Sequence, residues 1–250
     1  MFKPQSVLWF VVLTVALSFA TYFLPLPVET KSLLVPLMLA FLPALVAVLI
    51  AYFTEGGEGI RQLFSTVRGA GRWVLIGALL GAFMRVAVLV IGKLMGMSIQ
   101  ADFSAPGTIF IILITIPFAW FEEFGWRRFA LDRLLRSRSP IAASLLLGIP
   151  WAVIHIILLF PGMMSVGAPA LPQTIVLVAM SIVLTWAYVR SGGSLLTVTL
   201  VHGVQNALVI LNRGVSVAEG TWLLMGVYVL IAATLIIVDR KIFNTQPSSA

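Results

Sequence analysis

The sequence contains no cysteine in its 250 residues. This absence excludes disulfide bonds, thiolate metal ligands and a cysteine nucleophile. Charged residues are also scarce: they make up 10% of the chain, whereas a soluble domain carries about 25%. Apolar residues account for 60%. So little charge beside so much apolar surface excludes an ordinary soluble domain and indicates an all-α, polytopic membrane protein.

The few charges are mostly basic, and the formal net charge is +7. In a soluble protein this excess would suggest a nucleic-acid partner. In a membrane protein, Lys and Arg collect in the cytoplasmic loops. We therefore expect membrane lipid around the chain and no nucleic-acid partner.

Apolar runs of about 20 residues predict spanning helices. We expect a single integral-membrane domain, residues 1–250, with eight spans and both termini on the same side of the membrane. The predicted spans are 7–24, 33–53, 73–95, 106–126, 141–160, 172–190, 194–211 and 221–239.

The distribution of basic residues predicts the orientation of these spans. With eight spans, twelve Lys and Arg fall on the side of the termini and three on the other side, with Arg85 inside a span. Both termini are therefore expected in the cytoplasm, in the plasma or inner membrane if the source is bacterial.

Ionisable side chains at membrane depth are costly and usually face the interior of the bundle. Both histidines of the chain fall in this class. The class consists of Arg85, Glu122, Glu123, His155 and His202. We expect Arg85 to be structural, either reaching the membrane surface or pairing with an inward carboxylate, and we assign it no chemistry.

The adjacent carboxylates Glu122 and Glu123 follow nineteen uncharged residues. Glu123 and Arg127 are four residues apart, with the carboxylate N-terminal, which is the better arrangement for an ion pair on a helix. Glu122 points about 100° away around the helix and is left free. If spans four and five form an antiparallel hairpin, Glu122 and His155 are equidistant from a midpoint at 138.5, inside the polar turn that joins the spans.

Two further residues are expected at a similar depth in the membrane. His202 lies eight residues into the seventh span, and Asn206 follows one turn later on the same face. We expect Glu122, His155, His202 and Asn206 to converge in a cavity that faces the cytoplasmic half.

This set of side chains is suited to hydrolysis of an amide bond. Glu122 can act as general base on a water that a histidine orients. His202 and Asn206 can then stabilise the oxyanion. Glutamate with two histidines is also a zinc ligand set, so Glu122, His155 and His202 could instead hold a metal. The residues alone leave both versions open, with either no cofactor or Zn.

Three motifs together resemble a known family. EEFGWR, Glu122 to Arg127, resembles the EExxxR motif of the CAAX prenyl endopeptidase type II / Abi family of intramembrane proteases, also called CPBP proteases. WAVIH, Trp151 to His155, is similar to its FxxxH motif, and HGVQN, His202 to Asn206, to its HxxxN motif. The resemblance places a catalytic core at residues 105–212.

The resemblance implies cleavage of a peptide bond in a membrane-associated substrate, near a prenylated C-terminus. It assigns the role of general base to Glu122 and supporting roles to Glu123 and Arg127. It implies that His155 acts on the same water. It also implies that His202 and Asn206 stabilise the oxyanion. The family is often labelled metalloprotease, and a metal-free glutamate mechanism is the rival view. Trp151 replaces the phenylalanine of the second motif. We expect Trp151 to keep the packing or substrate-groove role of that phenylalanine.

Two other functions remain open. The chain could be a non-proteolytic Abi or immunity-type membrane scaffold, which would use the helices without the chemistry. A proton-coupled transporter is a third reading, but it favours inverted repeats, and the sequence shows none. For a protease, the partner is a peptide or a lipidated protein.

Overall fold

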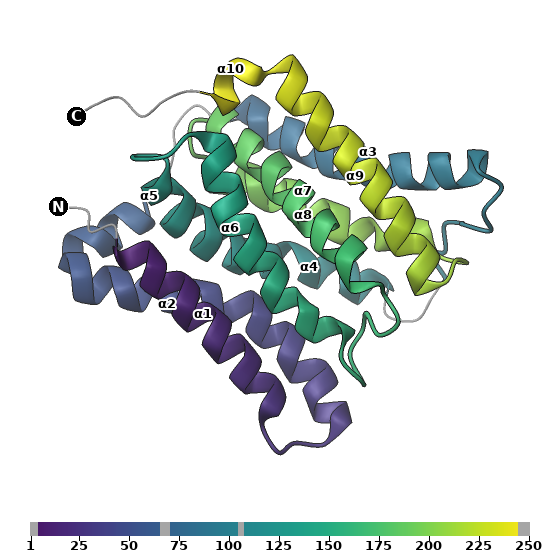
Figure 1. Ribbon diagram of the computed structural model, residues 1–250, viewed down its shortest axis with the longest axis horizontal. Coiled ribbons are helices and arrows are strands. Elements are labelled where there is room, and N and C mark those ends of the chain that lie inside the picture. Colours follow the sequence, from purple (N-terminus) through teal and green to yellow (C-terminus); the bar gives the residue numbers. More distant parts are fainter. Residues whose placement is uncertain (1–4, 66–70, 105–107, 245–250) are drawn as a thin grey trace.

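The computed structural model describes residues 5–65, 71–104 and 108–244. Within these ranges the chain is a bundle of long helices, and the one extended pairing is an isolated antiparallel bridge between Gln100 and Arg213 (Figure 1). The long elements are α1 (Gln5–Phe23), α2 (Val28–Leu63), α3 (Gly71–Leu94), α4 (Thr108–Glu123), α6 (Pro140–His155), α7 (Ala170–Arg190), α8 (Leu195–Ala207) and α9 (Val217–Val238). The short elements are the π-helix η1 (Phe124–Leu131), α5 (Asp132–Leu134), the 3₁₀ turns η2 (Ile156–Leu159) and η3 (Leu208–Asn212), and α10 (Arg240–Phe243). The predicted all-α class is confirmed.

Seven of the described helices are long and apolar enough to cross a membrane. Their outward side chains are apolar too: Leu33, Phe53 and Leu94 are 77%, 78% and 82% exposed, as expected of surfaces that face lipid. The predicted span that is not among these seven is the fourth, 106–126, which coincides with α4; this helix has 16 residues before the chain continues as η1. The count of eight spans and the cytoplasmic termini stay predictions.

Helix α8 lies in the middle of the bundle, between α3 and α4. Glycines bring these helices into close contact, as is common for helices in membranes. A Cβ added at Gly77 or Gly81 of α3 would lie 2.5 or 2.6 Å from a carbonyl oxygen of α8. A Cβ at Gly203 of α8 would lie 2.8 Å from the Cα of Ile116 on α4. These three glycines therefore set the position of α8 relative to both neighbours.

The segment after α4 is a π-helix, a rare conformation that often marks functional sites. It packs against α2, and a Cβ at Gly125 would meet the backbone of Pro43 at 2.5 Å. Our predicted span ran as one helix to residue 126, so the last three residues of that prediction were assigned the wrong helix type. The glycine allows the backbone contact with α2, and no helical periodicity in the sequence predicts this contact.

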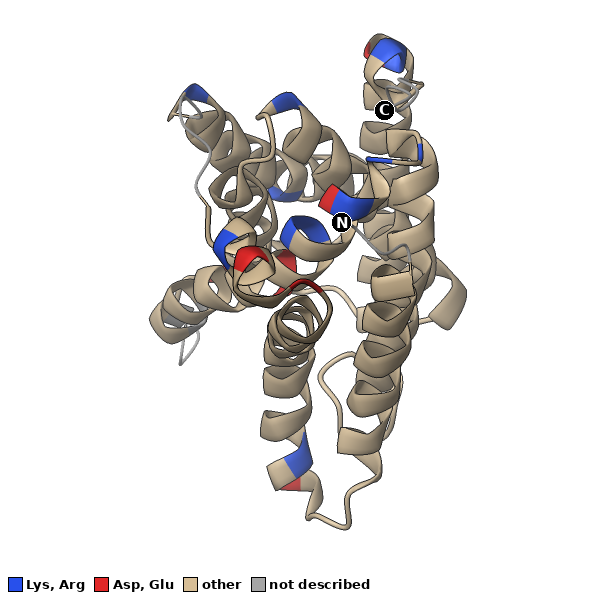
Figure 2. Cartoon of the chain, turned by 90° about the vertical axis from the view of Figure 1, so that its left-hand side faces the viewer, with Lys and Arg blue, Asp and Glu red and all other residues tan. Residues whose placement is uncertain are grey.

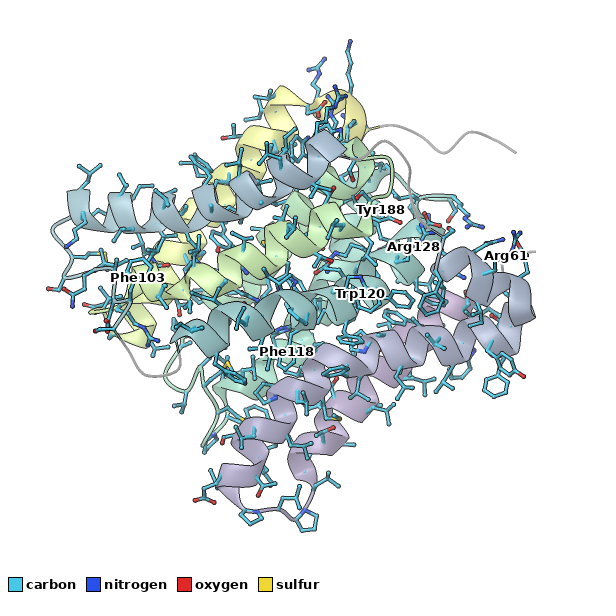
Figure 3. All side chains as sticks on the ribbon, turned by 180° about the vertical axis from the view of Figure 1, so that it is seen from behind. Arg61, Phe103, Phe118, Trp120, Arg128 and Tyr188 are labelled. Atoms are coloured by element: carbon cyan, nitrogen blue, oxygen red, sulfur yellow. The ribbon has the colours of Figure 1, made fainter. Side chains whose placement is uncertain are left out.

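Arginines attach this segment to the end of α2. Arg133 forms an ion pair with Glu55, 2.7 Å between Nη2 and Oε2. Arg128 donates to the carbonyl oxygens of Gln62 and Leu63, at 2.6 and 3.1 Å, which have no further helical turn to bond them (Figure 3). Arg128 of η1 and Arg133 of α5 therefore join this part of the chain to the end of α2.

A second set of polar contacts joins α7 to the end of α9. Asp239 accepts hydrogen bonds from Arg190 at 2.6 Å and from Trp186 at 2.8 Å. These donors, Arg190 above all, hold the pKa of the Asp239 carboxyl below its ordinary value. Charged residues gather at the end of the bundle where α1 begins and α9 ends (Figure 2).

The glycine contacts of α8 yield a prediction. Gly81→Ala places a methyl group against the carbonyl of Val201, so it should lower the free energy of unfolding by about 1–3 kcal/mol through overpacking. Gly226→Ala is the matched control, because Gly226 lies in α9 with open space around the added carbon, and helix propensity favours alanine there. Thermal unfolding in detergent should show Gly81→Ala below the wild type and Gly226→Ala at or above it. Equal melting temperatures for the two variants would contradict the close contact.

Candidate active site

Three helices supply the polar groups of the candidate site. Glu122 and Glu123 end α4, Trp151 and His155 lie on the last turns of α6, and His202 lies in the middle of α8. Their side chains are buried or nearly so, and Glu123 has no exposed surface. Contacts inside the bundle thus connect Glu122, Glu123, Trp151, His155 and His202. The fourth predicted site residue, Asn206, bonds Gln205 instead.

Glu122 faces α6. Its Oε2 accepts a hydrogen bond from the indole N–H of Trp151 at 3.0 Å. The same oxygen lies 3.9 Å from Nε2 of His155. The predicted antiparallel pairing of the fourth and fifth spans therefore placed Glu122 correctly at the level of His155.

Glu123 faces the other way and is held by two partners. Arg127 pairs with it, 3.1 Å from Nε to Oε2, as the spacing predicts. His202 Nδ1 lies 2.7 Å from Oε1 of the same carboxylate. Because a carboxylate accepts, His202 donates through Nδ1, which leaves Nε2 as its outward nitrogen. We had expected His202 to converge with Glu122, His155 and Asn206, and its contact with Glu123 was not predicted.

His155 has a defined tautomer. Its Nδ1 lies 2.7 Å from the backbone carbonyl oxygen of Trp151. A carbonyl can only accept, so Nδ1 carries the proton. In the neutral ring, Nε2 is therefore an acceptor, and this is the nitrogen that faces Glu122.

The formal charges of the site do not balance with both histidines neutral. Glu122 and Glu123 contribute two negative charges, and Arg127 contributes one positive charge. Arg127 is buried and also lies over the ring of Trp151, 4.7 Å from its centroid. The buried cluster therefore lacks one positive charge, and an uncompensated charge is costly in a buried site.

A second polar network, on the far side of His202, includes residues that the sequence analysis missed. Gln205 donates through its amide nitrogen to Oδ1 of Asn206 and accepts from the hydroxyl of Tyr228 at 2.7 Å. Arg85 donates to the carbonyl oxygen of Gln205 at 2.7 Å and to Oδ1 of Asn212 at 3.1 Å. Arg85 therefore caps the end of α8, and it pairs with no carboxylate among the contacts described.

Gln205 could have been suspected from the sequence, because it is a polar residue next to Asn206 in an apolar helix. Tyr228 carried no such signal, since it lies in α9, outside all three motifs. In the network it orients the amide of Gln205. With Oδ1 of Asn206 accepting from Gln205, its NH₂ group is the part left to donate elsewhere.

The zinc alternative can be compared with this geometry. Among the residues that the structure describes, no three His, Asp or Glu side chains are arranged so that they could hold a metal ion. Glu122, His155 and His202 do not fit a three-ligand site in this arrangement, and we derive no step through a metal.

These features define an all-α membrane protein with a buried cluster of carboxylates and imidazoles. Comparison with known proteins adds a match to a family over part of the chain. Residues 104–208 match the model of the type II CAAX prenyl endopeptidase, Rce1-like, family. This match confirms the resemblance predicted from the three motifs.

One curated relative is named CAAX prenyl protease 2, from Methanococcus maripaludis. It is 30% identical over 159 residues, which cover 59% of this chain and 55% of the relative. The chain thus spans about half the length of the curated relative it matches.

The cap of α8 yields a prediction for stability. Arg85→Met removes the donor and leaves the carbonyl of Gln205 and the amide of Asn212 without this partner, at a cost of about 1–3 kcal/mol for each buried group left unsatisfied. Lys93→Met is the control, because it removes the same charge from an exposed position on the same helix. Unfolding in detergent should show a clear loss for Arg85→Met only. A melting temperature unchanged by Arg85→Met would mean that the network does not hold α8.

Proposed function

We propose that this protein is an intramembrane endopeptidase that uses Glu122 as the general base on a water. The observation that carries the proposal is the position of the Glu122 carboxylate, buried between the indole N–H of Trp151 and Nε2 of His155. The family and the name of the curated relative support a CAAX-protease-like activity. The segment that matches the family contains all three motifs.

The separation of Glu122 and His155 suits a shared water. A distance of 3.9 Å is too long for a direct hydrogen bond. A water about 2.8 Å from each atom can bridge such a gap. Nε2 of neutral His155 accepts a hydrogen bond from this water, so the water is held by two acceptors and its oxygen is free to attack.

The proposed reaction conserves every proton. Glu122 takes one proton from the water as its oxygen adds to the carbonyl carbon of the substrate. The proton then passes to the amide nitrogen, directly or through His155, as the C–N bond breaks. The products are a carboxylic acid and an amine, which become a carboxylate and an ammonium group by proton exchange, and the buried cluster returns to its starting charge.

The oxyanion formed in this step needs donors. Asn206 can supply its NH₂ group, because Gln205 occupies its oxygen. His202 can donate through Nε2 when the ring is protonated, and the carboxylate of Glu123 stabilises that imidazolium. Each such donor contributes a factor of about 10²–10³ to the rate in comparable sites.

We propose a membrane-associated peptide with a prenylated C-terminal region as the substrate class. The supporting observations are the family match and the name of the curated relative. The basic residues of η1 and α5 lie close to the site, which supports an active site in the cytoplasmic half. A scaffold of the Abi or immunity type is the alternative, and it would not require Glu122.

The central prediction concerns Glu122→Gln. This change keeps the shape and an acceptor for Trp151 but removes the base, so the turnover number should fall by about 10²–10⁴-fold. Glu58→Gln is the matched control, since Glu58 is exposed and pairs with Arg61 away from the site. The measurement is cleavage of a quenched fluorescent farnesylated CAAX peptide in proteoliposomes, with the unprenylated peptide in parallel.

Three results would count against the proposal. If the folded wild-type protein cleaved neither peptide, it would not be this class of protease. If Glu122→Gln matched the wild type in cleavage, another group would be the base. Complementation of a cellular phenotype by Glu122→Gln would favour the scaffold.

A further inference from the structure

Trp151 contacts both of the groups proposed to act on the water. Its indole N–H donates to Oε2 of Glu122 at 3.0 Å, and its backbone carbonyl accepts from Nδ1 of His155 at 2.7 Å. The same carboxylate oxygen lies 3.9 Å from the other nitrogen of His155. One residue thus determines the position of the carboxylate through its side chain and that of the imidazole through its main chain.

The indole itself is closely packed. It is 1% exposed, and its ring packs edge to face with His155 and His202, with centroids 5.2 and 5.5 Å apart. Arg127 covers the ring at 4.7 Å. A side chain packed on several sides holds its N–H in one direction, as a positioned donor requires.

Glu122 needs such a donor because its partners are few. Glu123 takes both Arg127 and His202, so the described partners of Glu122 are the indole and the more distant His155. A phenylalanine, the residue of the family motif at this position, would retain an aromatic ring but lose the N–H. The tryptophan therefore adds a contact to the reacting carboxylate that the motif residue cannot make.

We propose that Trp151 is a positioning residue whose indole N–H orients the Glu122 carboxylate toward the water shared with His155. This inference rests on the proposed function and adds to it. The hydrogen bond selects one rotamer of the Glu122 carboxylate. Loss of this bond should lower the fraction of molecules in which the carboxylate is oriented for reaction, without changing the contacts that bind substrate.

The test is Trp151→Phe, assayed with the farnesylated peptide in proteoliposomes. A hydrogen bond to a charged group corresponds to about a 10- to 100-fold effect. We expect kcat to fall by about that factor, with KM within twofold of the wild type. Trp186→Phe is the matched control, because it also removes an indole donor from a carboxylate, that of Asp239, and Trp186 forms part of the α7–α9 contact outside the site.

A second variant separates the N–H from the shape of the side chain. Benzothienylalanine incorporated at position 151 has sulfur in place of the indole N–H and nearly the same outline. It should show the same loss of kcat, at a melting temperature close to that of the wild type. If Trp151→Phe fails to fold, the kcat of the benzothienylalanine variant still tests the role of the N–H.

Three outcomes would overturn the inference. Full kcat in either variant would mean that the N–H is dispensable. A rise in KM at unchanged kcat would mean that the side chain contacts substrate instead of orienting Glu122. An inactive wild-type protein would overturn the proposed function, and this inference with it.

Discussion

The site depends on the buried interaction of Glu123 with Arg127 and His202. A carboxylate without exposed surface is too costly to keep charged unless it is paired. Arg127 and His202 pair with it from η1 and from α8. This contact joins α4, the π-helix and α8, and it leaves the adjacent Glu122 to face α6. The division between a structural and a reactive carboxylate follows from that pairing.

Around this contact the bundle is arranged to limit movement. Gly203 allows α8 to approach α4, and Gly77 and Gly81 allow α3 to approach α8 from the other side. Arg85 caps the end of α8, close to Asn206. These contacts lie outside the reacting groups, yet they set the distances on which general-base chemistry depends.

Several parts of the site could be predicted because they depend on local geometry. The ion pair of Glu123 and Arg127 follows from a spacing of four residues on a helix. The approach of Glu122 to His155 follows from the length of the turn between two antiparallel helices. The roles in catalysis, the choice between a metal and a metal-free mechanism, and the cytoplasmic orientation were open at the level of sequence, and all three remain proposals here.

The sequence by itself determined the all-α membrane class, the positions of the helices and the three motifs, because hydrophobic length and helical period are local properties. Only the tertiary structure decided that His202 binds Glu123, 79 residues away, that Gln205 and Tyr228 orient Asn206, and that Trp151 donates to Glu122. Such contacts depend on how closely two helices approach and how each is rotated. The distance and the rotation are set by residues at the crossing point, such as Gly203 against Ile116. The periodicity along one helix does not predict them.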